Sequence, residues 1–254
     1  MSKLKAVSLF SGIGGIDLGF EQAGIETVLQ VEKDKYCLDI LGKQWPSIRR
    51  MSNIKLVTAE DCAGANILYG GFPCQPVSDQ GERRVYNDSR WLWPEFHRLI
   101  NEVKPDYAVI ENVPGLLKRG GGTVLRNLAE SGYDAEWSTL TARAFGAPHH
   151  RERLFIIAYP CGNGRSLLGE LARDTRSAEW LSAPTLHKWE DWRGWLNETV
   201  AIGNWNETQT SVLGVDDGLS EKLDKKRIKA LGNAVVPAVA QYIGEQIVKD
   251  YNQQ

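Results

Sequence analysis

Short apolar runs alternate along most of the chain with segments whose apolar positions recur at helical spacing. Continuous runs of roughly four to eight apolar residues are typical of strands buried in a parallel sheet, whereas positions three and four apart favour amphipathic helices. The expected strands are 4–10, 27–31, 65–72, 107–110, 134–141 and 154–159, and the expected helices are 16–23, 34–45, 91–103 and 123–131. This alternation predicts an α/β fold with a doubly wound, mostly parallel sheet.

The alternation stops at the end of the sixth expected strand. From Cys161 to about Leu223 the sequence is rich in Gly, Asn, Thr and Trp and has no clear periodicity. Val235–Val248 then predicts one closing helix. We therefore expect a large α/β domain at 1–159, completed by 228–254, with a small irregular domain at 160–227. A module of that size has a thin core, so it should pack on the large domain.

Composition is that of a globular protein, with 42% hydrophobic and 24% charged residues among 254. No apolar run approaches the roughly 18 residues of a membrane span, and the N-terminus leads directly into a strand without a signal peptide. The four cysteines are scattered and the four histidines lack metal-ligand spacing. These features predict a cytoplasmic protein with neither a metal nor a membrane partner.

The formal net charge of −2 does not by itself indicate a nucleic-acid partner, but the basic residues are clustered. Six arginines lie between positions 143 and 176, and five lysines or arginines lie between positions 222 and 229. Such clusters could neutralise phosphates, and they are equally compatible with a solvated basic face.

A glycine-rich turn, Phe10-Ser11-Gly12-Ile13-Gly14-Gly15, joins the first expected strand to the first helix. Glycines allow the backbone to approach a ligand, and a helix N-terminus attracts a carboxylate. Glu32, at the end of the second strand, is placed to bond a ribose hydroxyl. The turn fits a nicotinamide fingerprint poorly, because the third glycine of that motif would fall at Asp17. An adenosine-containing cofactor is one interpretation, and a plain turn beside a surface carboxylate is the other.

A second motif, Gly70-Gly71-Phe72-Pro73-Cys74-Gln75-Pro76, follows the third strand. Two prolines restrict the backbone on either side of Cys74. The thiol stands where a strand ends, which is a usual place for catalytic residues on α/β sheets. A lone cysteine is often only a small buried hydrophobe, but the prolines and the loop location weaken that interpretation.

Three further motifs follow in order: Glu111-Asn112-Val113-Pro114 at a strand end, Arg151-Glu152-Arg153 at a strand start, and Gly232-Asn233-Ala234-Val235-Val236-Pro237 before the closing helix. Taken singly, they could be a helix cap, a surface charge pattern and a helix-start turn. Their joint order and spacing make chance a poor explanation.

Together these motifs resemble those of the DNA (cytosine-5) methyltransferases, and they cover nearly the whole chain outside Cys161–Leu223. The resemblance implies a Rossmann-like sheet that binds S-adenosylmethionine and releases S-adenosylhomocysteine. It also implies that 160–227 is a target-recognition domain and that a monomer acts on double-stranded DNA. Because that domain is short for the family, we expect a short recognition sequence.

The resemblance implies separate catalytic roles for four residues around a cytosine flipped out of the duplex. Cys74 would add to C6 and form a covalent intermediate, which makes C5 nucleophilic. Glu111 would engage N3 as a proton donor, and it therefore needs a pKa raised by burial. Arg153 would contact O2, while Arg151 would support the site or the backbone.

The resemblance also assigns ligand contacts. Asn53-Ile54 stand where the family usually has Asp-Ile, with the Asp on the adenine amino group, and an Asn carbonyl could accept the same hydrogen bond. The residues assigned to the cofactor are Phe10, Ser11, Gly12, Gly14, Glu32, Lys33, Asn53, Ile54, Pro73, Asn233 and Ala234. Those assigned to DNA, on a mobile loop after Cys74, are Gln75, Ser78 and Arg90.

Three alternatives are compatible with parts of the pattern. One is a tRNA cytosine-5 methyltransferase of the same fold, and another is a non-catalytic DNA-binding relative, disfavoured by the intact Cys74, Glu111 and Arg153. A nicotinamide oxidoreductase is the most distant. The expected location is the cytoplasm of a bacterium or a phage-infected cell, and a cognate restriction endonuclease is left open.

Overall fold

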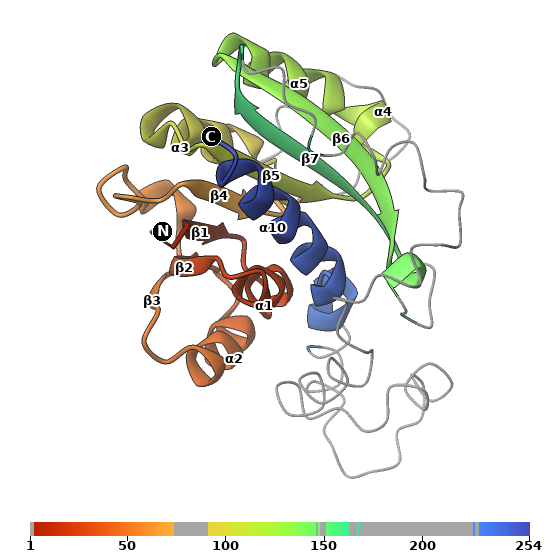
Figure 1. The fold of residues 1–254 in the computed structure, drawn as a ribbon. Helices are drawn as coiled ribbons and strands as arrows, with labels where there is room; N and C mark the ends of the chain where they lie inside the picture. Colours follow the sequence, from red (N-terminus) through yellow and green to blue (C-terminus); the bar gives the residue numbers. More distant parts are fainter. Residues whose placement is uncertain are drawn as a thin grey trace.

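The computed structural model describes residues 3–73, 91–145, 147, 151–162, 167, 226 and 229–254. A seven-stranded sheet runs through this part of the chain, with helices on both faces (Figure 1). The expected residues Cys74, Gln75, Ser78 and Arg90, and nearly all of the expected small domain, lie outside the described residues.

The strand order is β3-β2-β1-β4-β5-β7-β6. The strands are β1 (Lys5–Leu9), β2 (Glu26–Val31), β3 (Arg49–Met51), β4 (Ile67–Gly70), β5 (Tyr107–Asn112), β6 (Tyr133–Thr141) and β7 (Glu152–Pro160). Neighbouring strands pair in parallel from β3 to β5, and β7 runs antiparallel to both of its neighbours. The predicted α/β class and mostly parallel sheet are therefore confirmed.

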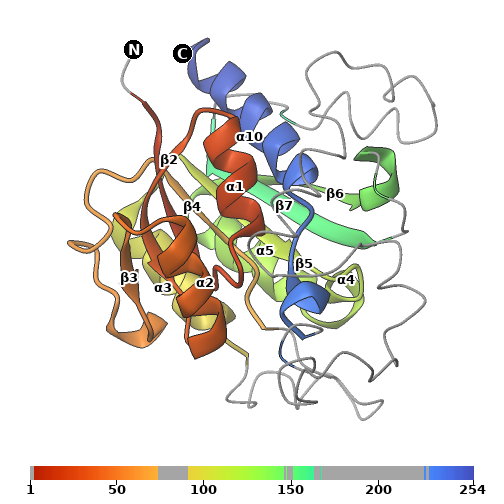
Figure 2. The same cartoon turned by 90° about the horizontal axis from the view of Figure 1, so that it is seen from below.

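Helices α1 and α10 cover one face of the sheet, and α3 and α5 cover the other (Figures 1 and 2). The helices are α1 (Gly15–Gln22), α2 (Lys35–Gln44), α3 (Trp93–Val103), α4 (Leu116–Arg119), α5 (Gly121–Glu130) and α10 (Pro237–Tyr251), with 3-10 turns η1 (Ile54–Leu56) and η3 (Ala142–Phe145). None of the described helices has the length and apolar character needed to cross a bilayer.

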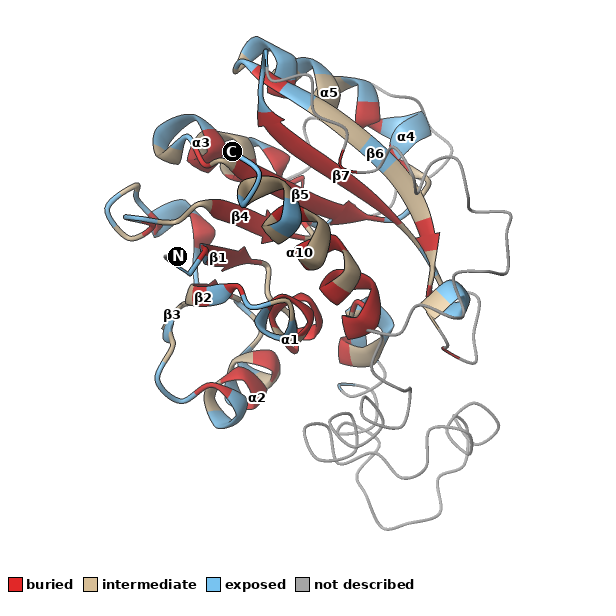
Figure 3. Ribbon diagram, in the orientation of Figure 1, coloured by how far each residue is buried: buried red, intermediate tan, exposed pale blue. Residues whose placement is uncertain are grey.

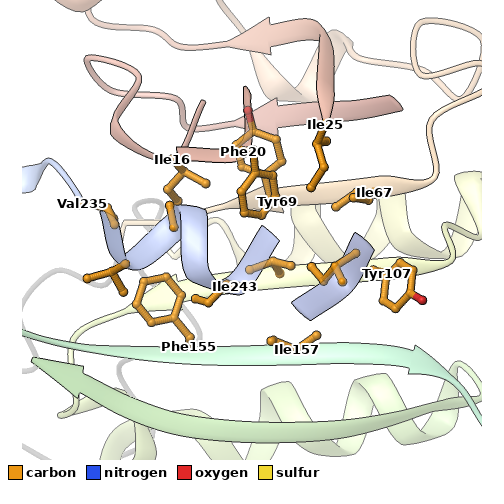
Figure 4. Packing of buried hydrophobic residues seen from close by; sticks show 14 of the residues in the cluster. Ile16, Phe20, Ile25, Ile67, Tyr69, Tyr107, Phe155, Ile157, Val235 and Ile243 are labelled. Atoms are coloured by element: carbon orange, nitrogen blue, oxygen red, sulfur yellow. The ribbon is translucent and has the colours of Figure 1, made fainter. Parts of the chain in front are cut away.

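Central strands are buried on both faces, which explains their continuous apolar sequences. Figure 3 shows β5 and β7 buried over nearly all of their length. On one face, Ile243 of α10 packs in a cluster with Phe20 of α1, Tyr69 of β4 and Phe155 of β7 (Figure 4). The closing helix predicted from the sequence thus returns to the sheet and packs beside the first helix.

Helices α1 and α10 approach each other closely at Gly19. A Cβ atom placed on Gly19 would lie 2.4 Å from the carbonyl oxygen of Pro237 and 2.6 Å from the backbone nitrogen of Gln241. The absence of a side chain therefore lets the two backbones meet. This contact holds the C-terminal part of the chain beside the turn that precedes α1.

Candidate active site

The glycine-rich turn between β1 and α1 has a left-handed backbone at three positions. The φ angles are 56° at Phe10, 57° at Gly12 and 85° at Gly14. This conformation is sterically unfavourable for Phe10, which has a side chain, and unfavourable backbone conformations are concentrated at functional sites. A Cβ on Gly14 would lie 2.4 Å from the ring of Trp45, whereas a Cβ on Gly12 would meet no atom of the described residues within 4 Å. The turn is thus packed against Trp45 at Gly14, and the described residues leave space beside Gly12.

Glu32 lies at the end of β2 and bonds the glycine-rich turn through its carboxylate. One oxygen accepts a hydrogen bond from the backbone N–H of Gly12 at 2.8 Å, and the other accepts one from that of Asp34 at 2.7 Å. Each carboxylate oxygen keeps a further lone pair, so a ribose hydroxyl could donate to Glu32 without displacing either contact. Ser11 adds to the same junction, because its N–H donates to the carbonyl of Val31 at 3.1 Å.

The expected adenine contact, Asn53, begins the 3-10 turn η1. Its Oδ1 accepts a hydrogen bond from the backbone N–H of Lys55 at 3.1 Å, while Ile54 is buried in the core. The Asn53 oxygen has a second lone pair, which can accept a hydrogen bond from an amino group. Lys33, the other residue expected beside adenine, lies between Glu32 and the start of α2 and is exposed.

The C-terminal segment, residues 232–236 before α10, packs against the glycine-rich turn. A Cβ on Gly15 would lie 2.3 Å from the carbonyl oxygen of Val235, so the two backbones are in direct contact. Ala234 packs against a cluster that includes Ile13 of the turn and Trp45. Asn233, which precedes it, is exposed. The segment expected to complete the cofactor site therefore lies against the first strand-to-helix turn.

The expected catalytic carboxyl, Glu111, lies in β5 next to the end of β4. Its residue is 8% exposed, and one oxygen is so close to Gly71 that a Cβ there would lie 2.2 Å from it. The other oxygen is 2.9 Å from Nε of Arg153, which extends from β7. Nη2 of Arg153 also lies 3.5 Å from the carbonyl oxygen of Gly232, in the C-terminal segment.

Burial raises the pKa of Glu111 to about 7 from an ordinary value of 4.5, against the opposing charges of Arg153 and Arg151. Both protonation states of the carboxyl are accessible near neutral pH. This is the property that a proton-donating Glu111 requires, and desolvation is its cause.

Arg151 carries hydrogen-bond donors that face the interior. Its Nε and Nη2 atoms are buried and have no hydrogen-bond partner within the described part of the chain. Burial, together with the like charge of Arg153, lowers the pKa of Arg151 to about 10, so the guanidinium remains charged at neutral pH. Buried donors of this kind are costly unless something accepts their hydrogen bonds.

Asn112 fixes the chain just before the nucleophile motif. Its Nδ2 donates to the carbonyl of Phe72 at 3.1 Å, and its Oδ1 accepts from the N–H of Val113 at 2.9 Å. The Phe72 ring packs against Trp91 and Trp93, with centroid distances of 5.1 and 5.6 Å. Pro73 is exposed at the end of this segment. The exit from β4 toward Cys74 is thus held by both a hydrogen bond and aromatic packing.

Asp17 is a buried polar residue whose role the sequence did not reveal. It accepts hydrogen bonds from Oγ of Ser8 at 3.0 Å and from Nε2 of Gln30 at 2.9 Å. Burial raises the pKa of Asp17 to about 6, and the bonds from Gln30 and Ser8 oppose that rise. The sequence signal that could have indicated a buried polar partner is the presence of two polar residues, Ser8 and Gln30, inside apolar strands. Their partner, Asp17, lies in the first turn of α1, just after the glycine-rich turn.

No three His, Cys, Asp or Glu side chains are placed to hold a metal ion in the part of the chain described here. The cysteines at 37 and 62 are buried, and burial raises the thiol pKa of each, to about 12 and about 11. These two thiols are therefore protonated at neutral pH and do not offer a nucleophile.

Comparison with solved structures defines the class of the fold. The chain matches the S. pombe Dnmt2 methyltransferase with a TM-score of 0.70 and 17% identity, covering 98% of this chain and all of the other. It matches the Entamoeba histolytica methyltransferase EhMeth with a TM-score of 0.68, 17% identity and 99% coverage of both chains. The fold is thus one found in methyltransferases.

Sequence comparison then identifies the family. A family model described as C-5 cytosine-specific DNA methylase matches residues 4–208, so the chain belongs to that family. Among curated relatives, the type II methyltransferase M.BspRI of Lysinibacillus sphaericus is 34% identical over 187 residues, covering 61% of this chain and 44% of its own length. M.Bsp6I of Bacillus sp. (strain RFL6) is 35% identical over 164 residues, with 61% and 52% covered. The chain spans about half the length of these relatives.

Proposed function

We propose that the protein transfers a methyl group from S-adenosylmethionine to C5 of a flipped-out cytosine in double-stranded DNA. Family membership and the methyltransferase fold support this activity. So do the relatives M.BspRI and M.Bsp6I, which are type II methyltransferases. The protein would act as a monomer without a metal, and its relatives make a cognate restriction endonuclease a reasonable partner to seek.

One observation carries the proposal: a buried carboxyl, Glu111, has a pKa of about 7 and lies against Gly71, three positions before Cys74. A cytosine ring resists attack at C6 until its N3 is protonated or hydrogen-bonded. A carboxyl with a pKa near the working pH can donate that proton and recover it. Arg153, 2.9 Å from Glu111, is positioned to orient the carboxyl and to donate toward the cytosine O2.

Cys74 is the proposed nucleophile. Its thiolate would add to C6 while Glu111 protonates or hydrogen-bonds N3, and C5 would become nucleophilic as a result. After C5 has been methylated, loss of its proton and elimination of the Cys74 thiolate would restore the aromatic ring. The charged Arg151, whose buried Nε and Nη2 have no hydrogen-bond partner among the described residues, would stabilise anionic groups in this site.

The residues around the glycine-rich turn fit the cofactor. S-adenosylmethionine, when bound, supplies an electrophilic methyl group on a sulfonium sulfur. Glu32 would accept hydrogen bonds from the ribose, and the N-terminus of α1 beyond Gly12 would attract the carboxylate. Asn53 and Lys33 would flank the adenine. The remaining proposed contacts to the cofactor come from Ser11, Ile54, Pro73, Asn233 and Ala234.

DNA recognition is assigned to two regions. Gln75, Ser78 and Arg90 would contact the duplex around the flipped base, and 160–227 would read the target sequence as a domain separate from the catalytic part, 1–159 with 228–254. Base-edge contacts from Arg and Asn side chains would supply specificity. A footprint over a long sequence would count against the short recognition site that we expect.

The test is transfer of labelled methyl from S-adenosylmethionine to unmethylated duplex DNA, with tRNA and Cys74→Ala protein assayed in parallel. Label on DNA that disappears with Cys74→Ala is the expected result, and bisulfite sequencing would then locate the modified cytosine. Label on tRNA alone, or no label from folded protein that binds the cofactor, would overturn the proposal.

A further inference from the structure

We propose that Arg98 of α3 is a positioning residue for adenine recognition, acting through the η1 turn. This inference rests on the proposed function, because it assumes that the turn beginning at Asn53 faces the adenine of S-adenosylmethionine. Among the described residues, the hydrogen bonds of Arg98 toward the expected cofactor site go to backbone carbonyls of that turn.

The guanidinium of Arg98 holds both ends of the turn with a single nitrogen. Its Nη2 donates to the carbonyl oxygens of Ile54 at 3.1 Å and of Val57 at 3.0 Å. These two carbonyls bracket η1, so the hydrogen bonds fix the orientation of the turn relative to α3. Asn53 stands at the entrance of the turn, and its Oδ1 accepts from the N–H of Lys55.

Two carboxylates on the same helix hold the guanidinium in place. Nε of Arg98 lies 3.0 Å from Glu95, and Nη1 lies 2.9 Å from Glu102. All three guanidinium nitrogens are therefore bonded, with two to acids on α3 and one to the turn. Surface ion pairs contribute little to stability by themselves, but here they preset the direction of Nη2. The arrangement is built to orient a backbone segment.

The same helix also braces the other wall of the expected cofactor site. Phe96, two positions before Arg98, stacks on the strained Phe10 with a centroid distance of 6.5 Å and an interplanar angle of 25°. Helix α3 thus touches both the glycine-rich turn and the η1 turn. Arg98 supplies the polar contact and Phe96 the apolar one, from behind the site.

The experiment measures binding of S-adenosylhomocysteine and of its inosine analogue, which has an oxo group in place of the adenine amino group. Isothermal titration calorimetry would compare wild-type protein with Arg98→Met and Arg98→Lys. The matched control is Tyr133→Phe. It removes a buried 2.8 Å hydrogen bond to the carbonyl of Pro105, which follows the C-terminal end of α3. All proteins are measured well below their unfolding temperatures.

We expect Arg98→Met to weaken S-adenosylhomocysteine binding about tenfold, the change expected when charge-assisted hydrogen bonds no longer hold the turn. The wild-type preference for the adenine compound over the inosine compound should fall toward one. Arg98→Lys should be intermediate, because an ammonium can reach the carbonyls but is not oriented by both acids. Tyr133→Phe should lower stability and leave the preference unchanged.

A purely structural Arg98 would lower the thermal stability or the folded fraction and leave the preference intact, and that result would overturn the inference. Wild-type protein that binds and prefers adenine, with an unchanged preference in Arg98→Met and Arg98→Lys, refutes the inference alone. Wild-type protein that binds neither compound refutes the proposed function, and the inference with it.

Discussion

Replacing Glu111 by glutamine should make the protein more stable and much less active. Glutamine keeps the shape of the carboxyl but carries no charge, so it mimics the protonated acid. The folded-state pKa of about 7 exceeds the ordinary value of 4.5, and burial is the main cause. Ionised Glu111 is therefore a cost to the folded state, even with the Arg153 ion pair in place.

The size and pH range of the effect follow from linkage. A rise from 4.5 to about 7 corresponds to about 3 kcal/mol of differential stability between the protonation states. Below pH 4.5 both folded and unfolded wild-type chains carry the proton, and the variant has no advantage from this residue. Between pH 4.5 and 7 the wild type loses stability relative to the variant, and above pH 7 the full difference is present.

Urea unfolding of Glu111→Gln and wild type at several pH values would measure this difference, alongside methyl transfer to duplex DNA. We expect the gap to grow from near zero at pH 4 to about 3 kcal/mol at pH 8, while kcat falls at least about a hundredfold with the loss of the proposed proton donor. Glu130→Gln, on the surface of α5, is the control and should change neither property. A gap that does not vary with pH, or a variant that retains its activity, would refute the reasoning.

Other predictions concern packing and buried charge. Asp17→Asn should add about 3 kcal/mol of stability at pH 8 and nothing below pH 3.8, because burial raises the Asp17 pKa from 3.8 to about 6. Urea unfolding at pH 8 and below pH 3.8 tests this. Gly19→Ala should cost about 1–3 kcal/mol of stability in thermal unfolding, since its Cβ would collide with the backbone of α10. Gly122→Ala, around which the described residues leave open space, should gain up to about 1 kcal/mol in the same assay. Tyr107→Phe should cost about 1 kcal/mol and speed hydrogen exchange at the end of α10, because it removes the hydrogen bond to Asp250.

Sheet class and element order could be predicted because the central strands are buried on both faces and are therefore continuously apolar. The short edge strand β3 was missed, since its three residues, Arg49–Met51, include two arginines and pair with β2 alone. The antiparallel direction of β7 was also not predicted. Strand direction depends on the path of the connecting chain, which hydrophobic periodicity does not encode.

The sequence motifs single out candidate site residues, whereas residues defined by three-dimensional pairing carry no such signal in the sequence. Glu111 was expected to need a raised pKa, and the structure supplies it through burial. Asp17 could not be understood before the strand register was known, because the register places Ser8 opposite Gln30 and lets both donate to it. Arg98 likewise looks like one more charged helical residue until α3 is placed against η1.

The electrostatics around Glu111 show why two arginines accompany one carboxyl. Burial alone would favour the neutral acid so strongly that the proton, once held, would be hard to donate. The positive charges of Arg153 and Arg151 oppose burial and bring the pKa back to about 7, where donating and recovering a proton are both inexpensive. By the same reasoning, Arg153→Met should do more than remove the proposed contact with the cytosine O2. Removing that charge should raise the Glu111 pKa further and move the alkaline limb of the pH–kcat profile to higher pH, and a profile shifted to lower pH would contradict this account.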